Sequence, residues 1–118
     1  MIHMIRHYIP TRSLNVVKLT LLFRHPAQIE PFEADYNRSL ALLEQMPGIL
    51  RRQANLVFGA PGGQSPYYRV LEFYFVDRQA LDAALLSPAG TAAGRAVVGF
   101  AGREVELLFS EVFEEVTN

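Results

Sequence analysis

The segment from Tyr67 to Val76 carries large side chains on both faces of any strand that it forms. Its residues alternate at the two-residue period of a strand and divide into two rows. These rows are Leu71, Phe73 and Phe75 on one face, and Tyr68, Val70 and Tyr74 on the other. Because both faces need cover, the pattern predicts a strand inside a sheet that is packed on both sides.

The segments before it predict a strand, a helix and a hairpin. The run VVKLTLLF at 16–23 alternates like a strand, and apolar residues then recur at helical spacing from Phe32 until Pro47-Gly48. Ile49 to Phe58 is a second strand, and the glycine-rich turn at 59–63 connects it to the segment described above.

The segments after it predict a helical crossover and a last strand. Asp77 and Ser87-Pro88 are typical helix starts, and alternation resumes from Glu104 to Phe113. The order is therefore βαββαβ, an α+β fold: a ferredoxin-like sandwich with an antiparallel four-stranded sheet. We expect residues 1–15 to be a loosely attached extension, 16–114 to be the domain and 115–118 to be a tail.

Composition narrows the class of protein. The chain has 118 residues, half of them hydrophobic, which suits one domain, and it contains no cysteine. No apolar run is long enough to span a membrane, and no secretory signal is evident, so we expect a cytoplasmic protein without membrane contact. Residues 1–71 sum to a charge of +4 and residues 72–118 to −5. This balance argues against a nucleic-acid partner.

The second apolar row of the Tyr67–Val76 strand predicts a partner. Helices cover only one face of a two-layer α+β domain, and a soluble monomer rarely leaves the other face apolar. A second copy packed sheet to sheet is the simplest symmetric cover, so we expect a homodimer through the sheet faces. The alternative is a face that is only half apolar and needs no cover.

Several phrases of the sequence together resemble one family. They are the strand VVKLTLLF with His25-Pro26, the helix ending at Met46-Pro47-Gly48, the block GAPGGQSPYYRVLEFYF at 59–75, the phrase from Asp77 to Leu81, and Ser87-Pro88-Ala89-Gly90. In their order and spacing over residues 16–112 they are similar to the EthD family of the dimeric α+β-barrel superfamily.

The resemblance implies a homodimer whose paired sheets form a barrel, with a cavity between the sheet and the first helix. It also implies small-molecule chemistry, because the superfamily includes cofactor-independent monooxygenases, isomerases and cyclases. Many family members carry a histidine on the first helix, and this chain has Ser39 at that place. Serine is not a general base near neutral pH, so a histidine-dependent reaction is in question.

Two residues of the first helix are candidates for ligand contact. Tyr36 and Ser39 share a stripe that we expect to face the sheet. In the functional interpretation they are polar ligand contacts in an apolar cavity, and Ser39 is also a candidate catalytic residue. In the structural interpretation Ser39 bonds to a helical carbonyl and Tyr36 belongs to the core.

The other candidates lie on the Tyr67–Val76 strand. Glu72 is a charge among apolar residues, and we expect Lys18 close to it on the neighbouring strand. This pair is structural in one interpretation; in the other, Glu72 is a catalytic base of raised pKa. Arg69 is a candidate anion contact, and the remaining substrate-binding candidates of this strand are Tyr68 and Tyr74.

No cofactor or metal is expected. His25 is the only histidine within the domain, which leaves haem without a convincing ligand, and His3 and His7 lack carboxylate support. Two functions therefore compete. One is an enzyme, or former enzyme, that binds an apolar, aromatic or polyketide-like compound for cofactor-independent proton transfer or oxygenation. The other is a non-catalytic dimeric binding or structural module.

Overall fold

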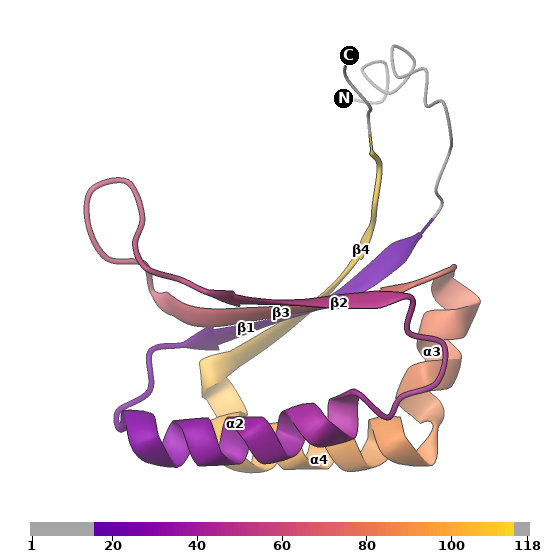
Figure 1. Cartoon of the computed structure of the whole chain (residues 1–118), viewed down its shortest axis with the longest axis horizontal. Coiled ribbons are helices and arrows are strands. Elements are labelled where there is room, and N and C mark those ends of the chain that lie inside the picture. Colours follow the sequence, from indigo (N-terminus) through magenta and orange to yellow (C-terminus); the bar gives the residue numbers. More distant parts are fainter. Residues whose placement is uncertain (1–15, 115–118) are drawn as a thin grey trace.

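The computed structural model describes residues 16–114, so the predicted N-terminal extension and C-terminal tail lie outside the described residues. The elements follow the predicted order, with two consecutive helices in the second crossover (Figure 1). They are β1 (Val17–Arg24), α2 (Ile29–Leu43), β2 (Arg51–Leu56), β3 (Tyr67–Phe75), α3 (Arg78–Leu86), α4 (Pro88–Ala101), a 3-10 turn (Gly102–Glu104) and β4 (Val105–Glu111).

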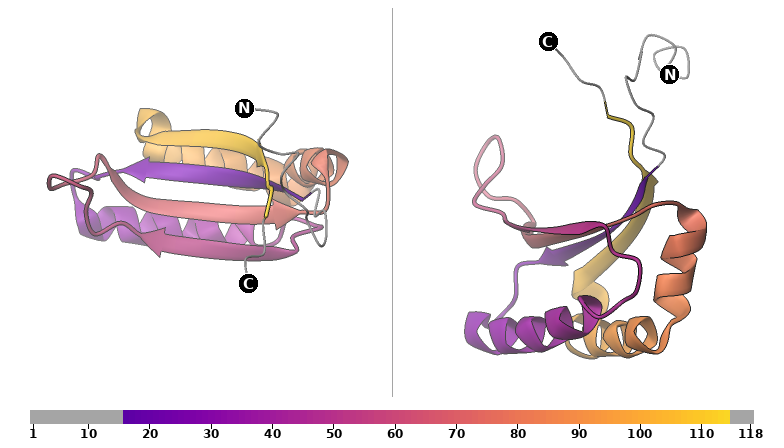
Figure 2. Two further views of the ribbon diagram at one scale, coloured as in Figure 1. Left: turned by 90° about the horizontal axis from the view of Figure 1, so that it is seen from above. Right: turned by 45° about the vertical axis from the view of Figure 1, so that its right-hand side comes forward.

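The four strands form one antiparallel sheet in the order β2-β3-β1-β4. All three helices lie on one side of this sheet, and α2 and α4 run side by side beneath it (Figures 1 and 2). The α+β ferredoxin-like fold expected from the sequence is confirmed, and β3 is an inner strand, as its two rows of large side chains require.

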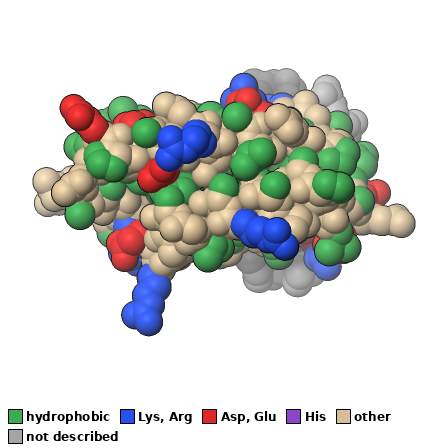
Figure 3. Space-filling view, turned by 90° about the horizontal axis from the view of Figure 1, so that it is seen from below, with side chains coloured by type: hydrophobic (Ala, Val, Ile, Leu, Met, Phe, Trp, Pro, Cys, Tyr) green, Lys and Arg blue, Asp and Glu red, His purple; other side chains and the backbone are tan. Residues whose placement is uncertain are grey.

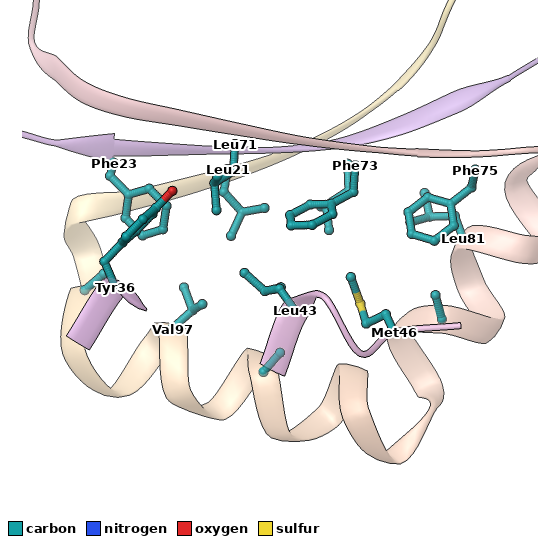
Figure 4. Close-up of a cluster of buried hydrophobic side chains, with 14 of the residues drawn as sticks. Leu21, Phe23, Tyr36, Leu43, Met46, Leu71, Phe73, Phe75, Leu81 and Val97 are labelled. Carbon is teal, nitrogen blue, oxygen red and sulfur yellow. The ribbon is translucent and has the colours of Figure 1, made fainter. Parts of the chain in front are cut away.

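The core fills the space between the sheet and the helices. The strands contribute one alternating row each, whose buried members are Val17, Leu19, Leu21 and Phe23 from β1 and Leu71, Phe73 and Phe75 from β3. The strand residues labelled in Figure 4 point toward Leu43, Met46 and Val97 on the helix side, with Leu81 at one end. Burying such side chains contributes ~1.5–3 kcal/mol each, so this layer contact provides most of the stabilisation.

One residue of β3 lies on the face opposite to the one predicted. The pairing of β1 with β3 runs from Val17 with Phe75 to Phe23 with Arg69, and then shifts so that Arg24 faces Tyr67. The extra residue in this irregularity is Tyr68, which turns to the helix side and bonds Glu33 of α2. A β-bulge reverses the alternation locally, so the prediction that Tyr68 shares a face with Val70 and Tyr74 is wrong.

The face of the sheet away from the helices, called the open face below, is mixed in character. Its apolar members are Leu22, Val70, Tyr74 and Leu108, and its polar members include Lys18, Thr20, Arg51, Gln53, Asn55, Glu72 and Glu106. The loop between β2 and β3 and the C-terminal end of β4 both rise on this side (Figure 1). The sequence overstated the apolar content of this face because it assigned Tyr68 to it.

Local signals set the ends of the helices. The side chain of Asp77 accepts a hydrogen bond from Ala80 N at 2.8 Å, and Ser87 Oγ accepts one from Gly90 N at 3.0 Å, which confirms both predicted helix starts. Gly90 lies against the last turn of α3, where an added Cβ would collide with the carbonyl oxygens of Ala84 and Leu85. The sharp α3–α4 corner therefore requires a glycine at this position.

The first and last strands leave the sheet at the same corner. Val17 of β1 pairs with Glu111 of β4 in the antiparallel ladder, and Val112 N donates a hydrogen bond to Val16 O at 2.9 Å. The chain thus enters and leaves the described domain through neighbouring residues.

Candidate functional site

Two of the predicted residues are buried on the inner side of α2. Tyr36 is 4 % exposed and Ser39 is 3 % exposed, which confirms that this stripe faces inward. The ring of Tyr36 meets Phe23 edge-on at 5.7 Å and stacks with Phe32 at 5.8 Å. Burial raises the pKa of Tyr36, against the opposing effect of Arg69, so its hydroxyl stays protonated in the neutral range.

Arg69 lies on the same side of the sheet, held by a carboxylate and three aromatic rings. Its Nη2 donates to Glu33 Oε2 at 2.7 Å, and the hydroxyl of Tyr68 donates to the same oxygen at 2.8 Å. The guanidinium carbon lies 4.2 Å from the ring centre of Tyr36, 5.3 Å from that of Tyr68 and 5.9 Å from that of Phe32. We call Glu33, Tyr36, Tyr68 and Arg69 the arginine cluster.

Glu33 is the member of this cluster that the sequence did not indicate. Its partial burial opposes ionisation, but the hydrogen bonds from Arg69 and Tyr68 outweigh burial and lower the pKa of Glu33. Its position one turn before Tyr36 on the same helix is the only signal in the sequence, and such spacing is common on surface helices.

Glu72 lies on the open face, in the ion pair that the sequence suggested. Lys18 Nζ donates to Glu72 Oε2 at 2.7 Å, and the two side chains are 26 % and 17 % exposed. The hydrogen bond to Glu72 raises the pKa of Lys18, although burial opposes this shift. Beside the pair, Tyr74 donates to Gln53 Oε1 at 3.1 Å, and the Arg51 guanidinium lies 4.3 Å from the centre of its ring.

The predicted site residues thus form two groups that the sheet separates. Tyr36, Ser39, Tyr68 and Arg69 lie on the helix side, whereas Glu72 and Tyr74 lie on the open face. The structure does not bring Glu72 and Ser39 together, so the two cannot act on the same atom of one ligand within one protomer. This separation follows from the strand period of two, which puts Arg69 and Glu72 on opposite faces.

The pockets beside the helix-side residues lie between α2 and α4. One, of about 290 Å³, is lined by Phe32 and Phe100, with prolines 26 and 31 beside them and Arg24, Asp35 and Glu104 among its polar residues. A wider and more open hollow adjoins it through Asp35 and Phe100 and is also lined by Ser39. We call the two together the seam pocket. The resemblance implied a cavity between α2 and the sheet, but the space shown there in Figure 4 is occupied by core side chains.

A further hollow, of about 390 Å³, lies at the other end of the sheet beside Leu81 and Phe109, but it contains none of the predicted site residues. Within residues 16–114 no three His, Asp or Glu side chains are grouped as a metal site would need.

On the outer surface of the helix layer, hydrophobic side chains lie scattered among polar and charged ones (Figure 3). In the described residues no helix has the length and apolar character needed to cross a membrane.

Comparison with solved structures defines the class of protein. A dimeric ferredoxin-like protein of unknown function from Jannaschia sp. CCS1 has a TM-score of 0.68 at 16% identity, covering 82% of this chain and 99% of that one. A cofactor-independent oxygenase from Streptomyces nogalater has a TM-score of 0.58 at 19% identity, covering 86% and 94%. The protein thus has the α+β ferredoxin-like fold of these structures.

One comparison is more specific. An EthD family protein from Bacillus halodurans C-125 has a TM-score of 0.80 and 29% identity, covering 83% of this chain and 99% of that chain. The resemblance to the EthD family that the sequence indicated is therefore confirmed. No family model and no curated protein matches the sequence.

Proposed function

We propose that this protein is a homodimeric small-molecule-binding protein of the EthD type, and that its ligand is an apolar compound held in the seam pocket. The observation that carries this proposal is the pairing of two aromatic rings, Phe32 and Phe100, at 5.6 Å beside a hollow of about 290 Å³. Ligand pockets in proteins begin near this size, at ~300 Å³, and are lined mainly by apolar and aromatic groups. The pocket suits a compound of one or two rings.

The chemistry we assign is proton transfer or oxygenation without a cofactor, the second of which is the activity of the oxygenase that shares this fold. Ser39 lines the wider part of the seam pocket and can hold a ligand oxygen by a hydrogen bond. It is not a base near neutral pH, so its assigned role is binding and orientation. Glu72, the base candidate from the sequence, lies on the open face and is no part of the seam pocket, so it belongs to a separate candidate site between the two sheets of a dimer.

The dimer in this proposal forms through the open face. The β2–β3 loop and the end of β4 flank that face (Figure 1). Each flank carries an exposed aromatic ring, Phe58 at 103 % and Phe113 at 55 % exposure. A second copy placed on the open face would cover these rings and the apolar part of the sheet, as an isologous interface does.

A non-catalytic module is the second candidate, and two observations favour it. Glu72 is bonded to Lys18 at 2.7 Å, which is the arrangement of a structural ion pair. The core side chains between the sheet and α2 also leave that region filled (Figure 4). In such a module the sheet would serve assembly alone.

Plugging the seam pocket separates the two candidates. Ala27 is exposed at the pocket rim, so Ala27→Trp fills the hollow without touching the core; Ala92→Trp adds the same side chain to an exposed site of α4 that lines none of the pockets described above. We expect 1-naphthol to bind the wild type and Ala92→Trp with equal affinity and to bind Ala27→Trp at least about tenfold more weakly. Titration calorimetry measures the three affinities. Equal binding to all three proteins would place the ligand elsewhere. Absence of binding to any of them would favour the non-catalytic module.

A further inference from the structure

The arginine cluster has the composition of an anion site with a carboxylate already in it. Two donors, Arg69 Nη2 and the Tyr68 hydroxyl, converge on the single oxygen Oε2 of Glu33 at 2.7 and 2.8 Å. Charge-assisted hydrogen bonds of this kind are the strong ones in proteins, and an arginine with a second donor is a common way to hold a carboxylate.

The donors are held more firmly than the carboxylate they bind. The side chain of Arg69 is 14 % exposed and lies against the rings of Tyr36, Tyr68 and Phe32. The side chain of Glu33 is 32 % exposed and comes from the first turns of α2, where it can rotate toward water. The two donors are therefore fixed by packing, whereas the Glu33 carboxylate can be displaced.

An exposed leucine and an imidazole ring flank the cluster. Leu56 of the edge strand β2 is the register partner of Arg69, so its side chain lies on the same face of the sheet, and it is 61 % exposed. The ring of His25 lies 5.6 Å from that of Tyr68 on the other side. A flat apolar body could lie against Leu56 and Tyr68 while its acidic group takes the place of the Glu33 carboxylate.

We propose that the arginine cluster is a binding site for an aryl carboxylate or an equivalent aromatic oxyanion, and that Glu33 occupies it as an internal competitor. This site is separate from the seam pocket, whose lining contains neither Arg69 nor Tyr68 nor Glu33. It therefore goes beyond the proposed function and does not depend on it. In the ligand-bound state Arg69 and Tyr68 keep both hydrogen bonds and exchange one carboxylate for another.

The test removes the competitor. Glu33→Ala frees the two donors, whereas Glu44→Ala removes a carboxylate of equal charge just beyond the end of α2, where Glu44 pairs with Arg52 at 2.8 Å. We expect 1-naphthoate to bind Glu33→Ala about tenfold more tightly than the wild type, and Glu44→Ala to change that affinity by less than about twofold. The neutral isostere 1-naphthamide should gain nothing from either substitution, because it lacks the charge.

A second variant keeps the proposal falsifiable through Arg69 itself. Adding Arg69→Gln to Glu33→Ala should abolish the gain for 1-naphthoate, and adding Arg69→Lys, which keeps a charge but loses the planar fork, should retain part of it. Each variant is first checked for a cooperative thermal unfolding transition that lies well above the temperature of the binding measurement. The proposal is overturned if Glu33→Ala and Glu44→Ala behave alike, if 1-naphthamide gains as much as 1-naphthoate, or if the double variant with glutamine still binds tightly.

Discussion

Two glycines of α4 differ in whether the surrounding structure leaves room for a side chain. A Cβ on Gly90 would lie 2.7 Å from Leu85 O and closer still to Ala84 O, whereas a Cβ on Gly94 would meet nothing within 4 Å. We expect Gly90→Ala to lower the free energy of unfolding by about 1–3 kcal/mol, because the α3–α4 corner must open. Gly94→Ala should raise it by about 0.5–1 kcal/mol, because alanine is the better helix former.

Urea unfolding of the two variants beside the wild type measures both effects. They should have opposite signs although the two substitutions are identical and lie four residues apart on one helix. A rise in the free energy of unfolding in both variants would mean that the corner does not need a glycine, and a fall in both would contradict the expectation for Gly94.

Single residues were predictable where their partners are near in sequence or fixed by the sheet order. Asp77 and Ser87 bond within their own helix starts, and Lys18 could be matched to Glu72 because β1 and β3 are neighbours in this fold. Glu33 was missed because its bond to Arg69 depends on how α2 docks on the sheet. Tyr68 was misplaced because no local signal marks the irregularity beside it.

The link between α2 and β3 is sensitive to acid. The hydrogen bonds from Arg69 and Tyr68 lower the pKa of Glu33 despite its burial, so the folded state favours the carboxylate. An unfolded glutamate titrates near ~4.3, so this stabilisation is fully present above that pH and is lost as pH falls through the lower pKa of the folded state. Glu33→Gln should therefore be less stable than the wild type at pH 7, with a difference that shrinks toward pH ~3.

The measurement is the urea midpoint of both proteins across this pH range. Glu44→Gln is the control for removing a carboxylate from the same part of the chain. If the difference between Glu33→Gln and the wild type stayed constant with pH, the stabilisation would not come from the ionised carboxylate.

Whole elements were predictable because each carries its own periodicity. The predicted strand at 16–23 differs from β1 by one residue at each end, and the one at 67–76 differs from β3 by one residue at its C-terminal end, since their alternation is clear. The first helix begins earlier than its apolar spacing suggested, at Ile29, because its first turn is exposed and needs no apolar stripe. The seam pocket could not be foreseen, because it depends on the relative placement of α2 and α4.

The assembly of the whole molecule can be tested on its open face. Leu108 on β4 points to that face and is 54 % exposed, whereas Val98 on α4 is 64 % exposed within the helix layer. If two copies meet through the sheets, Leu108→Glu places a charge in the interface and should shift the protein to a monomer. Val98→Glu should leave the mass unchanged. Sedimentation equilibrium of the three proteins at equal concentration gives the masses.

A wild-type monomer in that experiment would contradict the sheet-to-sheet dimer directly. Dissociation by Val98→Glu but not by Leu108→Glu would instead place the contact between copies on the helix layer. The fold itself would be unaffected by either result, because the helix-facing core is complete within one chain.

Because Val16 and Val112 meet at one corner of the sheet, the domain could be circularly permuted. Since the two positions are already hydrogen bonded, a short bridge between them would make the domain circular without stretching any strand. Reopening the circle in the exposed turn at 59–63 would begin the chain with β3 and end it with β2, while every strand kept its neighbours. Folding of such a rearranged chain would mean that the contacts between strands, and not the order of the strands along the chain, specify this domain.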